Sequence, residues 1–129
     1  MLELGIKGKE SVVVNDGNTA KSMGSGALNV FATPAMIALM ELTTWRSLEE
    51  HLEEGDGTVG TAISMKHIAA TPLGKEVSCE SELIEMDGRR LLFKVTAYDE
   101  SGVVGEGTHE RFVVNKEKFQ KKVESKFEK

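Results

Sequence analysis

The sequence predicts an α+β domain in which one antiparallel sheet of about five strands packs against a single long helix. Three patterns support this fold class. Residues 30–54 have the composition of one long helix, and residues 58–115 change to the two-residue alternation of strands. After Asn115, apolar residues recur at every fourth position, which adds a C-terminal helix. The chain of 129 residues is long enough for one core, so we expect residues 1–129 to form a single domain.

The predicted central helix organises the chain. We expect Thr33 to cap its N-terminus through the side-chain hydroxyl and Pro34 to occupy the first helical position. The first half, residues 35–42, is apolar on nearly every face, which is typical of a buried helix. Glu41 is the exception, and a buried carboxylate needs a charged partner, an altered protonation state or a cavity. The acidic second half should lie in solvent, and Gly55 should end the helix.

Short strands separated by turn residues account for most of the remaining chain. A β-branched strand at residues 10–14 precedes a glycine-bearing loop or short helix at 18–29. Four further strands are expected after the helix, at 58–71, 75–86, 89–98 and 103–115. The alternation predicts one shared face for Val59, Thr61, Ile63, Met65 and His67. Gly105 and Gly107 in the last strand indicate a bulge or a close approach by another backbone.

The last residues are predicted to form an amphipathic helix capped by Asn115. We expect Phe119 and Val123, on its apolar stripe, to pack against the body of the domain. Its lysines are interpreted as a solvated face, and a docking patch for phosphates is the alternative.

Composition excludes several classes of function. The net charge of −5 argues against a nucleic-acid-binding protein. No apolar run approaches the length of a membrane span, and residues 1–10 lack the apolar core of a signal peptide. The single cysteine, Cys79, precludes an internal disulfide and fits a reducing compartment, so we expect a cytoplasmic protein. We interpret Cys79 itself as a small buried hydrophobe.

Two other kinds of site are rejected on sequence grounds. Glycines at 55, 57 and 60 match the letters of a dinucleotide fingerprint, but a helix precedes them and a strand follows, which reverses the required order. The three histidines, His51, His67 and His109, lack metal-ligand spacing, so no metal site is expected.

Three residues are difficult to explain as scaffold alone. Glu41 stands among aliphatic residues, Thr33 lies at a helix start that stabilises developing negative charge, and His67 falls on an apolar strand face. A simple cap for Thr33 and a hydrogen-bonded core histidine for His67 are the alternatives. The His-Glu-Arg triplet at 109–111 adds a dense polar cluster within a strand, and a surface ion pair at a sheet edge is the alternative. A carboxylate, a hydroxyl and an imidazole in one small domain together indicate a catalytic site.

Several motifs, taken with their spacing, resemble one family. They are VFATP at 30–34, LME at 39–41, VGTAI at 59–63, HxAATPxG at 67–74, DGRRL at 87–91 and GxGTHER at 105–111. With these motifs the chain resembles the hotdog-fold thioesterases of the fluoroacetyl-CoA thioesterase type. The resemblance implies a hotdog fold, in which the sheet wraps around the long helix. It also implies cytoplasmic homodimers with active sites at the subunit interface.

Carried over by position, the resemblance implies a catalytic set of Thr33, Glu41 and His67. It further implies that Gly60 is a backbone contact to the acyl thioester and that Arg111 is a substrate ligand. Residues 24–29 carry no aromatic side chain, unlike the halogen-selective member, so the acyl group is left open.

The predicted function is hydrolysis of a small acyl-CoA thioester to the free acid and CoA. Glu41 attacks the carbonyl or activates water, Thr33 orients Glu41 or the water, and His67 transfers the proton. Coenzyme A is part of the substrate, so no separate cofactor is expected. Few aromatics and a one-layer sheet leave apolar surface uncovered, which predicts a homodimer or a higher even assembly.

Two alternatives use the same cleft. One is a non-catalytic acyl-CoA or acyl-carrier binding protein, in which Glu41 and His67 are structural hydrogen-bonding partners. The other is a hotdog dehydratase acting on hydroxyacyl thioesters, which also pairs a histidine with a carboxylate. Free thiol, no turnover, or an enoyl product without thiol distinguishes the three.

Overall fold

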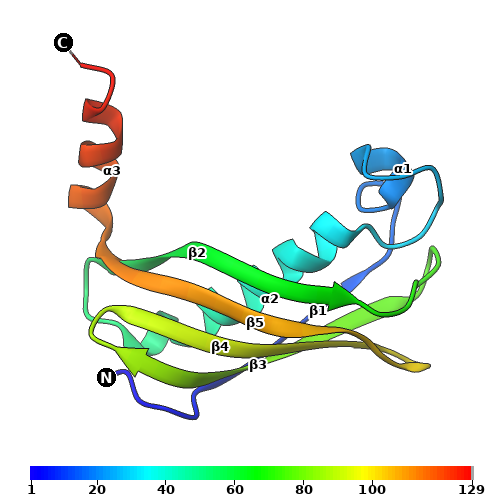
Figure 1. Cartoon of the computed structure of the whole chain (residues 1–129), viewed down its shortest axis with the longest axis horizontal. Helices are drawn as coiled ribbons and strands as arrows, with labels where there is room; N and C mark the ends of the chain where they lie inside the picture. The colour runs from blue at the N-terminus through cyan, green and yellow to red at the C-terminus, as the bar shows by residue number, and fades with distance from the viewer. Residues whose placement is uncertain (129) are drawn as a thin grey trace.

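The computed structural model describes residues 1–128, which form one antiparallel sheet, a long helix and shorter helices (Figure 1). The strands are β1 (Lys7–Val13), β2 (Asp56–His67), β3 (Glu76–Asp87), β4 (Arg90–Asp99) and β5 (Gly102–Asn115). The helices are α1 (Ala20–Met23), α2 (Thr33–Leu48), the 3-10 turn η1 (Glu49–His51) and α3 (Lys116–Ser125). None of the helices within the described residues is long and apolar enough to cross a membrane.

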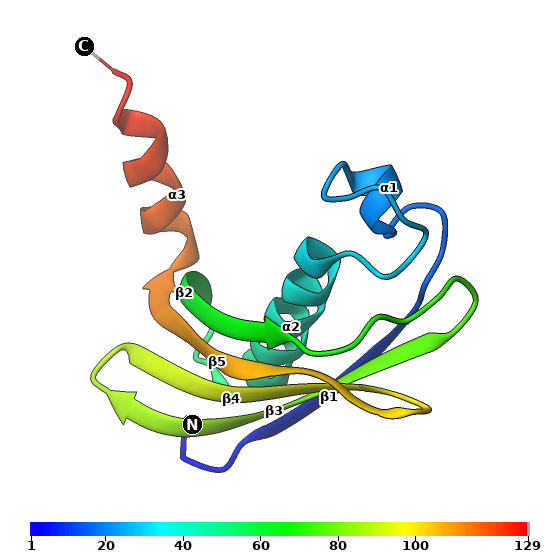
Figure 2. The same ribbon diagram turned by 45° about the vertical axis from the view of Figure 1, so that its right-hand side comes forward.

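The sheet has the strand order β1-β3-β4-β5-β2, so β1 and β2 form its two edges. Every neighbouring pair of strands is antiparallel. The sheet curves around α2, whereas α1 and α3 lie at opposite ends of the molecule (Figure 2). The predicted fold class, a five-stranded antiparallel sheet on one long helix with a C-terminal helix, is confirmed.

The core lies between α2 and the concave face of the sheet. Side chains of α2 that point to the sheet are spaced three and four residues apart, and they are Ala35, Met36, Leu39, Met40, Thr43, Thr44 and Leu48. The expectation that residues 35–42, the first half of this helix, are buried on nearly every face is wrong, and Trp45 in the second half is also partly exposed. Ala38 is exposed, Trp45 is 37% exposed and the Glu41 side chain is 44% exposed, because the sheet covers one side of the helix.

Both predicted ends of α2 need correction. Ala32 is the N-cap, since its carbonyl accepts the first helical hydrogen bond from Met36 N at 3.0 Å, and Thr33 is the first helical residue. The Thr33 hydroxyl therefore makes no cap bond. The helix ends at Leu48 rather than at Gly55, because Leu48 is the last of its side chains that the core buries.

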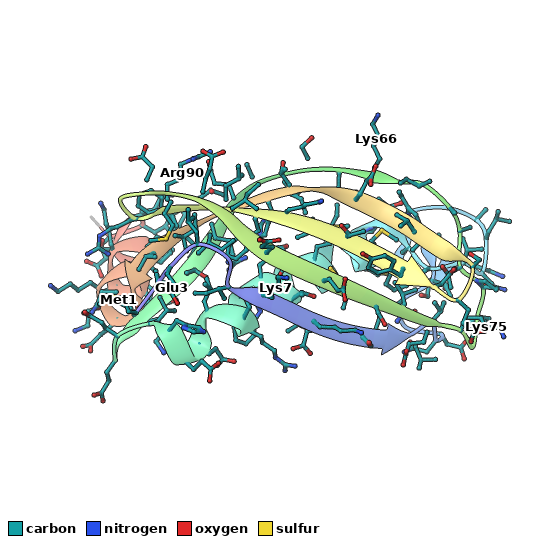
Figure 3. All side chains as sticks on the ribbon, turned by 90° about the horizontal axis from the view of Figure 1, so that it is seen from below. Met1, Glu3, Lys7, Lys66, Lys75 and Arg90 are labelled. Atoms are coloured by element: carbon teal, nitrogen blue, oxygen red, sulfur yellow. The ribbon has the colours of Figure 1, made fainter. Side chains whose placement is uncertain are left out.

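A β-bulge in β2 changes which side chains face the core. The register with β5 shifts between Gly60 and Ala62, so Thr61 is the extra residue. The predicted inward direction is confirmed for the residues after the bulge, namely Ile63, Met65 and His67. It is wrong for Thr61 and for Val59, which lies on the opposite face because one extra residue reverses the alternation. Lys66, on the outer face, projects away from the sheet (Figure 3).

The terminal helix α3 is capped as predicted but does not pack as predicted. Asn115 Oδ1 accepts a hydrogen bond from Lys118 N at 3.0 Å. Phe119 and Val123 are 38% and 41% exposed, so the expectation that both pack on the body is wrong for the single chain. The reason is the direction of α3, which leaves the end of β5 and points away from the sheet (Figure 1).

Gly107 provides a test of the close approach between β5 and β2. A Cβ built on Gly107 would overlap the Ser64 carbonyl oxygen and would lie 2.6 Å from Met65 Cα. Both are backbone atoms of the adjacent strand, so Gly107→Ala should destabilise the fold by about 1–3 kcal/mol in a denaturant titration. Thr108→Ala, at the exposed neighbouring position, should stay within about 0.5 kcal/mol of the wild type. Equal stability of the two variants would contradict this packing.

Candidate active site

A hydrogen bond joins the start of α2 to the end of β2. Thr33 Oγ1 lies 2.7 Å from His67 Nδ1. Ile63 is the first inward-facing residue after the bulge, and every second residue of a strand faces the same side. Met65 and His67 therefore also point inward. Its other ring nitrogen, Nε2, is buried and has no hydrogen-bond partner among residues 1–128. This arrangement orients the imidazole through one nitrogen and leaves the other nitrogen available for proton transfer.

A second polar group lies further along α2. Glu41 Oε2 is 3.5 Å from Arg111 Nη1 on β5. The Arg111 side chain is only 7% exposed, and it donates from Nε to Thr58 Oγ1 at 2.8 Å and from Nη2 to the Thr58 carbonyl at 3.1 Å. Burial lowers the pKa of Arg111, and the Glu41 carboxylate opposes that effect. Arg111 thus presents a fixed positive charge to a carboxylate that is open to solvent on its other side.

His109 completes this second group. A surface ion pair does form, between Glu110 and Arg90, but β5 is not an edge strand and alternation along it sends His109 and Arg111 inward. Glu110 bonds Arg90 and Thr61 on the outer face, and these two partners lower its pKa, Thr61 most strongly. His109 is 2% exposed and contacts the Ala62 carbonyl and Arg111.

The sequence did contain a signal for His109. The inward positions before it on β5 are Gly105 and Gly107, and the strict two-residue period predicts the same face for His109 and Arg111. His109 and Arg111 therefore continue the inward face that Gly105 and Gly107 begin, which does not fit an exposed sheet edge.

Gly60 lies where the second group converges. A Cβ added to Gly60 would lie 2.8 Å from Glu41 Oε2, 3.2 Å from Arg111 Nη1 and 3.2 Å from His109 Cε1. The missing side chain therefore leaves room for three polar side chains beside the backbone of the bulge. Backbone N–H groups at such a bulge are suited to bind a developing oxyanion.

The two groups are separate within one chain. Thr33 and Glu41 are eight residues apart on α2, which corresponds to about 12 Å along the helix axis. In the part of the chain that the structure describes, no hydrogen bond connects Glu41 with Thr33 or His67. A groove of about 540 Å³ borders the second group, and its lining includes Trp45, Thr58, Arg111 and Phe119.

Metal and thiol chemistry have little support at this site. No cluster of three or more histidine, cysteine, aspartate or glutamate side chains within residues 1–128 is arranged to hold a metal ion. Cys79 is fully buried, as predicted, and burial raises the pKa of its thiol to about 11. At neutral pH the thiol is therefore protonated and is a poor nucleophile.

The curved sheet around one helix, with a carboxylate and a threonine on that helix and a histidine on β2 bonded to the threonine, defines a hotdog-fold protein of the thioesterase class. The family model for fluoroacetyl-CoA-specific thioesterases matches residues 14–117. The chain belongs to this family and is an acyl-CoA thioester hydrolase. It is 47% identical over 97 residues to the fluoroacetyl-CoA thioesterase of Streptantibioticus cattleyicolor, covering 75% of this chain and 70% of that protein.

Solved structures agree with this assignment. A crystal structure of a fluoroacetyl-CoA thioesterase has a TM-score of 0.90 and 38% identity, over 98% of both chains. A mutant of a fluoroacetyl-CoA-specific thioesterase in complex with fluoroacetate and CoA has a TM-score of 0.85 and 39% identity, covering 92% of this chain and 99% of that one. A hot-dog-like protein from Thermanaerovibrio acidaminovorans, 24% identical with a TM-score of 0.89, covers 98% of this chain and 93% of its own and shows the fold alone. The predicted hotdog fold and family are confirmed.

Mutation of Thr33 can distinguish two roles of its hydroxyl, as the partner of His67 or as the cap of α2. Thr33→Ala should lower kcat about tenfold, because one orienting hydrogen bond of about 1–1.5 kcal/mol is lost. In a His67→Ala background the same substitution should change stability by no more than about 0.5 kcal/mol, since the hydroxyl then has no imidazole partner to lose and caps no backbone N–H. Thr33→Ser keeps the hydroxyl and serves as the control with near-normal kcat. A loss of stability near 1 kcal/mol for Thr33→Ala in the His67→Ala background would instead favour the cap.

Proposed function

We propose that the chain hydrolyses small acyl-CoA thioesters at sites formed between two copies, with Glu41 from one copy and the Thr33–His67 pair from the other. The separation of the two polar groups supports this proposal. Proton transfer requires groups about 2.6–3.2 Å apart or one bridging water, whereas about 12 Å of helix lies between Thr33 and Glu41. A second copy can supply the missing group to each site.

The free edge of β2 supports assembly through this strand. β2 is a 12-residue edge strand, and an open edge is suited to pair with another chain. Next to it, Trp45 of α2 is partly exposed and shares a groove with Thr58. Antiparallel pairing of two such edges brings the His67 end of each strand toward the Gly57 end of the other. We therefore propose a homodimer, or a higher even assembly, with equivalent sites related by two-fold symmetry.

Each side chain has a role in the proposed reaction. The Glu41 carboxylate attacks the thioester carbonyl carbon, or it takes a proton from a water that attacks. N–H groups near Gly60 bind the oxyanion that forms, and Arg111 places a positive charge beside the groove as a ligand for the substrate. In the first route the thiolate leaves and water then hydrolyses the acyl–Glu41 anhydride, whereas in the second route water attacks the thioester directly. Both routes end in the free acid and CoA and use no separate cofactor.

The leaving thiolate of CoA needs a proton, and His67 is suited to give it. In its protonated form the imidazole donates Nδ1–H to the Thr33 hydroxyl oxygen and carries a second proton on Nε2. Nε2 is the buried atom without a partner in the described chain, so a substrate atom is a natural partner for it. After the C–S bond breaks, transfer of the Nε2 proton to the thiolate releases CoA as the thiol and leaves a neutral ring, which regains its proton from solvent.

A substrate panel tests the function directly. Thiol release from acyl-CoA esters of increasing chain length, starting with acetyl-CoA and fluoroacetyl-CoA, should identify turnover of short chains. Binding without thiol release would favour an acyl-CoA binding protein, and an enoyl product from hydroxyacyl-CoA without thiol would favour a dehydratase.

The role of Glu41 leads to a specific expectation. Glu41→Gln keeps shape and hydrogen bonding but removes basicity, so kcat should fall at least ~10²-fold, as is typical for lost acid–base catalysis. Affinity for the acyl-CoA should survive, since the amide introduces no new charge. Thiol release and equilibrium binding measured on the same preparation separate the two effects. Unchanged turnover in a folded Glu41→Gln variant would end the catalytic assignment.

Mixing two inactive variants tests the shared site. If each site takes Glu41 and His67 from different copies, a heterodimer of Glu41→Gln and His67→Ala contains one intact site. Random exchange of subunits makes about half of the dimers mixed, so about a quarter of wild-type activity should return. A site within one chain predicts no recovery. Light scattering should give at least twice the 14.1 kDa chain mass, and a monomer at micromolar concentration would contradict the assembly.

We also infer a cytoplasmic location. The free, buried thiol of Cys79 is compatible with a reducing compartment, and an acyl-CoA substrate fits the same setting.

A further inference from the structure

His109 is a buried ionisable side chain to which the proposed reaction assigns no role. It is 2% exposed and lies on the inward face of β5, where an apolar residue would fill the space without polar demands. Both of its ring nitrogens nevertheless have partners, one on β2 and one on β5. Two specific hydrogen-bonding partners and a position beside a candidate catalytic carboxylate indicate that His109 does more than fill space in the core.

The two partners allow a single protonation state. His109 Nδ1 lies 2.8 Å from the Ala62 carbonyl oxygen, which can only accept, so Nδ1 carries a proton. Nε2 lies 3.0 Å from Arg111 Nη1, which can only donate, so Nε2 carries none. The ring is therefore neutral, with its proton on Nδ1. Burial lowers the pKa of His109, and the Arg111 charge acts in the same direction, whereas the Ala62 carbonyl and the nearby carboxylates of Glu41 and Glu110 oppose it.

Through Nε2, the imidazole fixes one arm of the Arg111 guanidinium. Thr58 holds Nε and Nη2, and His109 holds Nη1, so the plane of the guanidinium has three attachments. Nη1 is also the atom nearest to Glu41, at 3.5 Å from Oε2. By accepting one Nη1 hydrogen, His109 keeps Arg111 from closing a full two-pronged ion pair with Glu41. The carboxylate then remains beside a positive charge but is free to react.

The β2 bulge makes this arrangement possible. It presents the Ala62 carbonyl to His109, and Gly60 leaves the space in which Glu41, Arg111 and His109 meet. A chain of contacts thus runs from the bulge through His109 and Arg111 to Glu41.

We propose that His109 is a positioning residue for the thioesterase reaction: as the Nδ1-protonated imidazole it connects the β2 bulge to Arg111 and holds the guanidinium at its distance from Glu41. This proposal rests on the proposed role of Glu41. It concerns the geometry of the base rather than contact with the substrate.

Two substitutions at His109 separate positioning from packing. His109→Leu keeps bulk but removes both hydrogen bonds, so kcat should fall about 10- to 100-fold, the scale of a small misplacement of a catalytic group. KM should change less than about threefold, because Thr58 still holds Arg111 through Nε and Nη2. His109→Gln offers an acceptor and a donor at similar reach, so it should recover most of the lost kcat. His51→Gln, at a histidine outside the site, is the matched control and should leave kcat and KM unchanged.

Stability and spectroscopy provide the remaining readouts. All variants are assayed at least 15 °C below their own melting temperatures, so that folding does not limit activity. Normal kcat in folded His109→Leu, or equal loss in the Leu and Gln variants, would overturn the proposal. Nitrogen-15 NMR of the imidazole should show a proton on Nδ1 and none on Nε2 at pH 7, and the opposite tautomer or the charged ring would also overturn it. Absence of thiol release by the wild type would instead reject the proposed function, and the NMR result would still judge the His109 tautomer.

Discussion

The packing of one face of α2 into the concave side of the sheet determines where every candidate residue lies. Positions that repeat every three or four residues, such as Met36 and Met40, fill the core against the sheet. The remaining face carries Glu41 and Trp45 toward the side that the sheet leaves uncovered. Because Thr33 and Glu41 belong to the same rigid helix, their separation is fixed, and the two polar groups cannot merge within one chain.

The bulge in β2 is the second constraint on the site. One extra residue reverses the alternation, so His67 faces inward while Val59 faces outward. The same irregularity brings Gly60 under Glu41 and turns the Ala62 carbonyl to His109. A regular strand would place a different set of side chains beside α2. The position of the bulge therefore links the shape of the sheet to the chemistry of the site.

The two charged residues of the site, Arg111 and Glu41, differ in how deeply they are buried. The buried member of the pair is the cation Arg111, which is satisfied by Thr58 and a neutral His109, whereas the Glu41 carboxylate is nearly half exposed. Burying a cation requires fixed acceptors, and the β2 backbone supplies one of them. The exposed Glu41 carboxylate can therefore contact a substrate while it stays beside the positive charge of Arg111. Of the possibilities that the apolar neighbours of Glu41 raised, the structure shows a charged partner, and the carboxylate itself is not buried.

The sequence by itself determined the fold class, the approximate strands, the Asn115 cap and the inward direction of His67, because these follow from short-range periodicity and turn chemistry. Its motifs also indicated the family and the candidate residues Thr33 and Glu41. Only the tertiary structure decided that the Thr33 hydroxyl bonds His67 instead of capping α2, and that α3 projects from the sheet. It also decided that Arg111 and His109 meet Glu41 over Gly60. These contacts join residues far apart in the chain, and local patterns carry no information about which distant side chain occupies a given space.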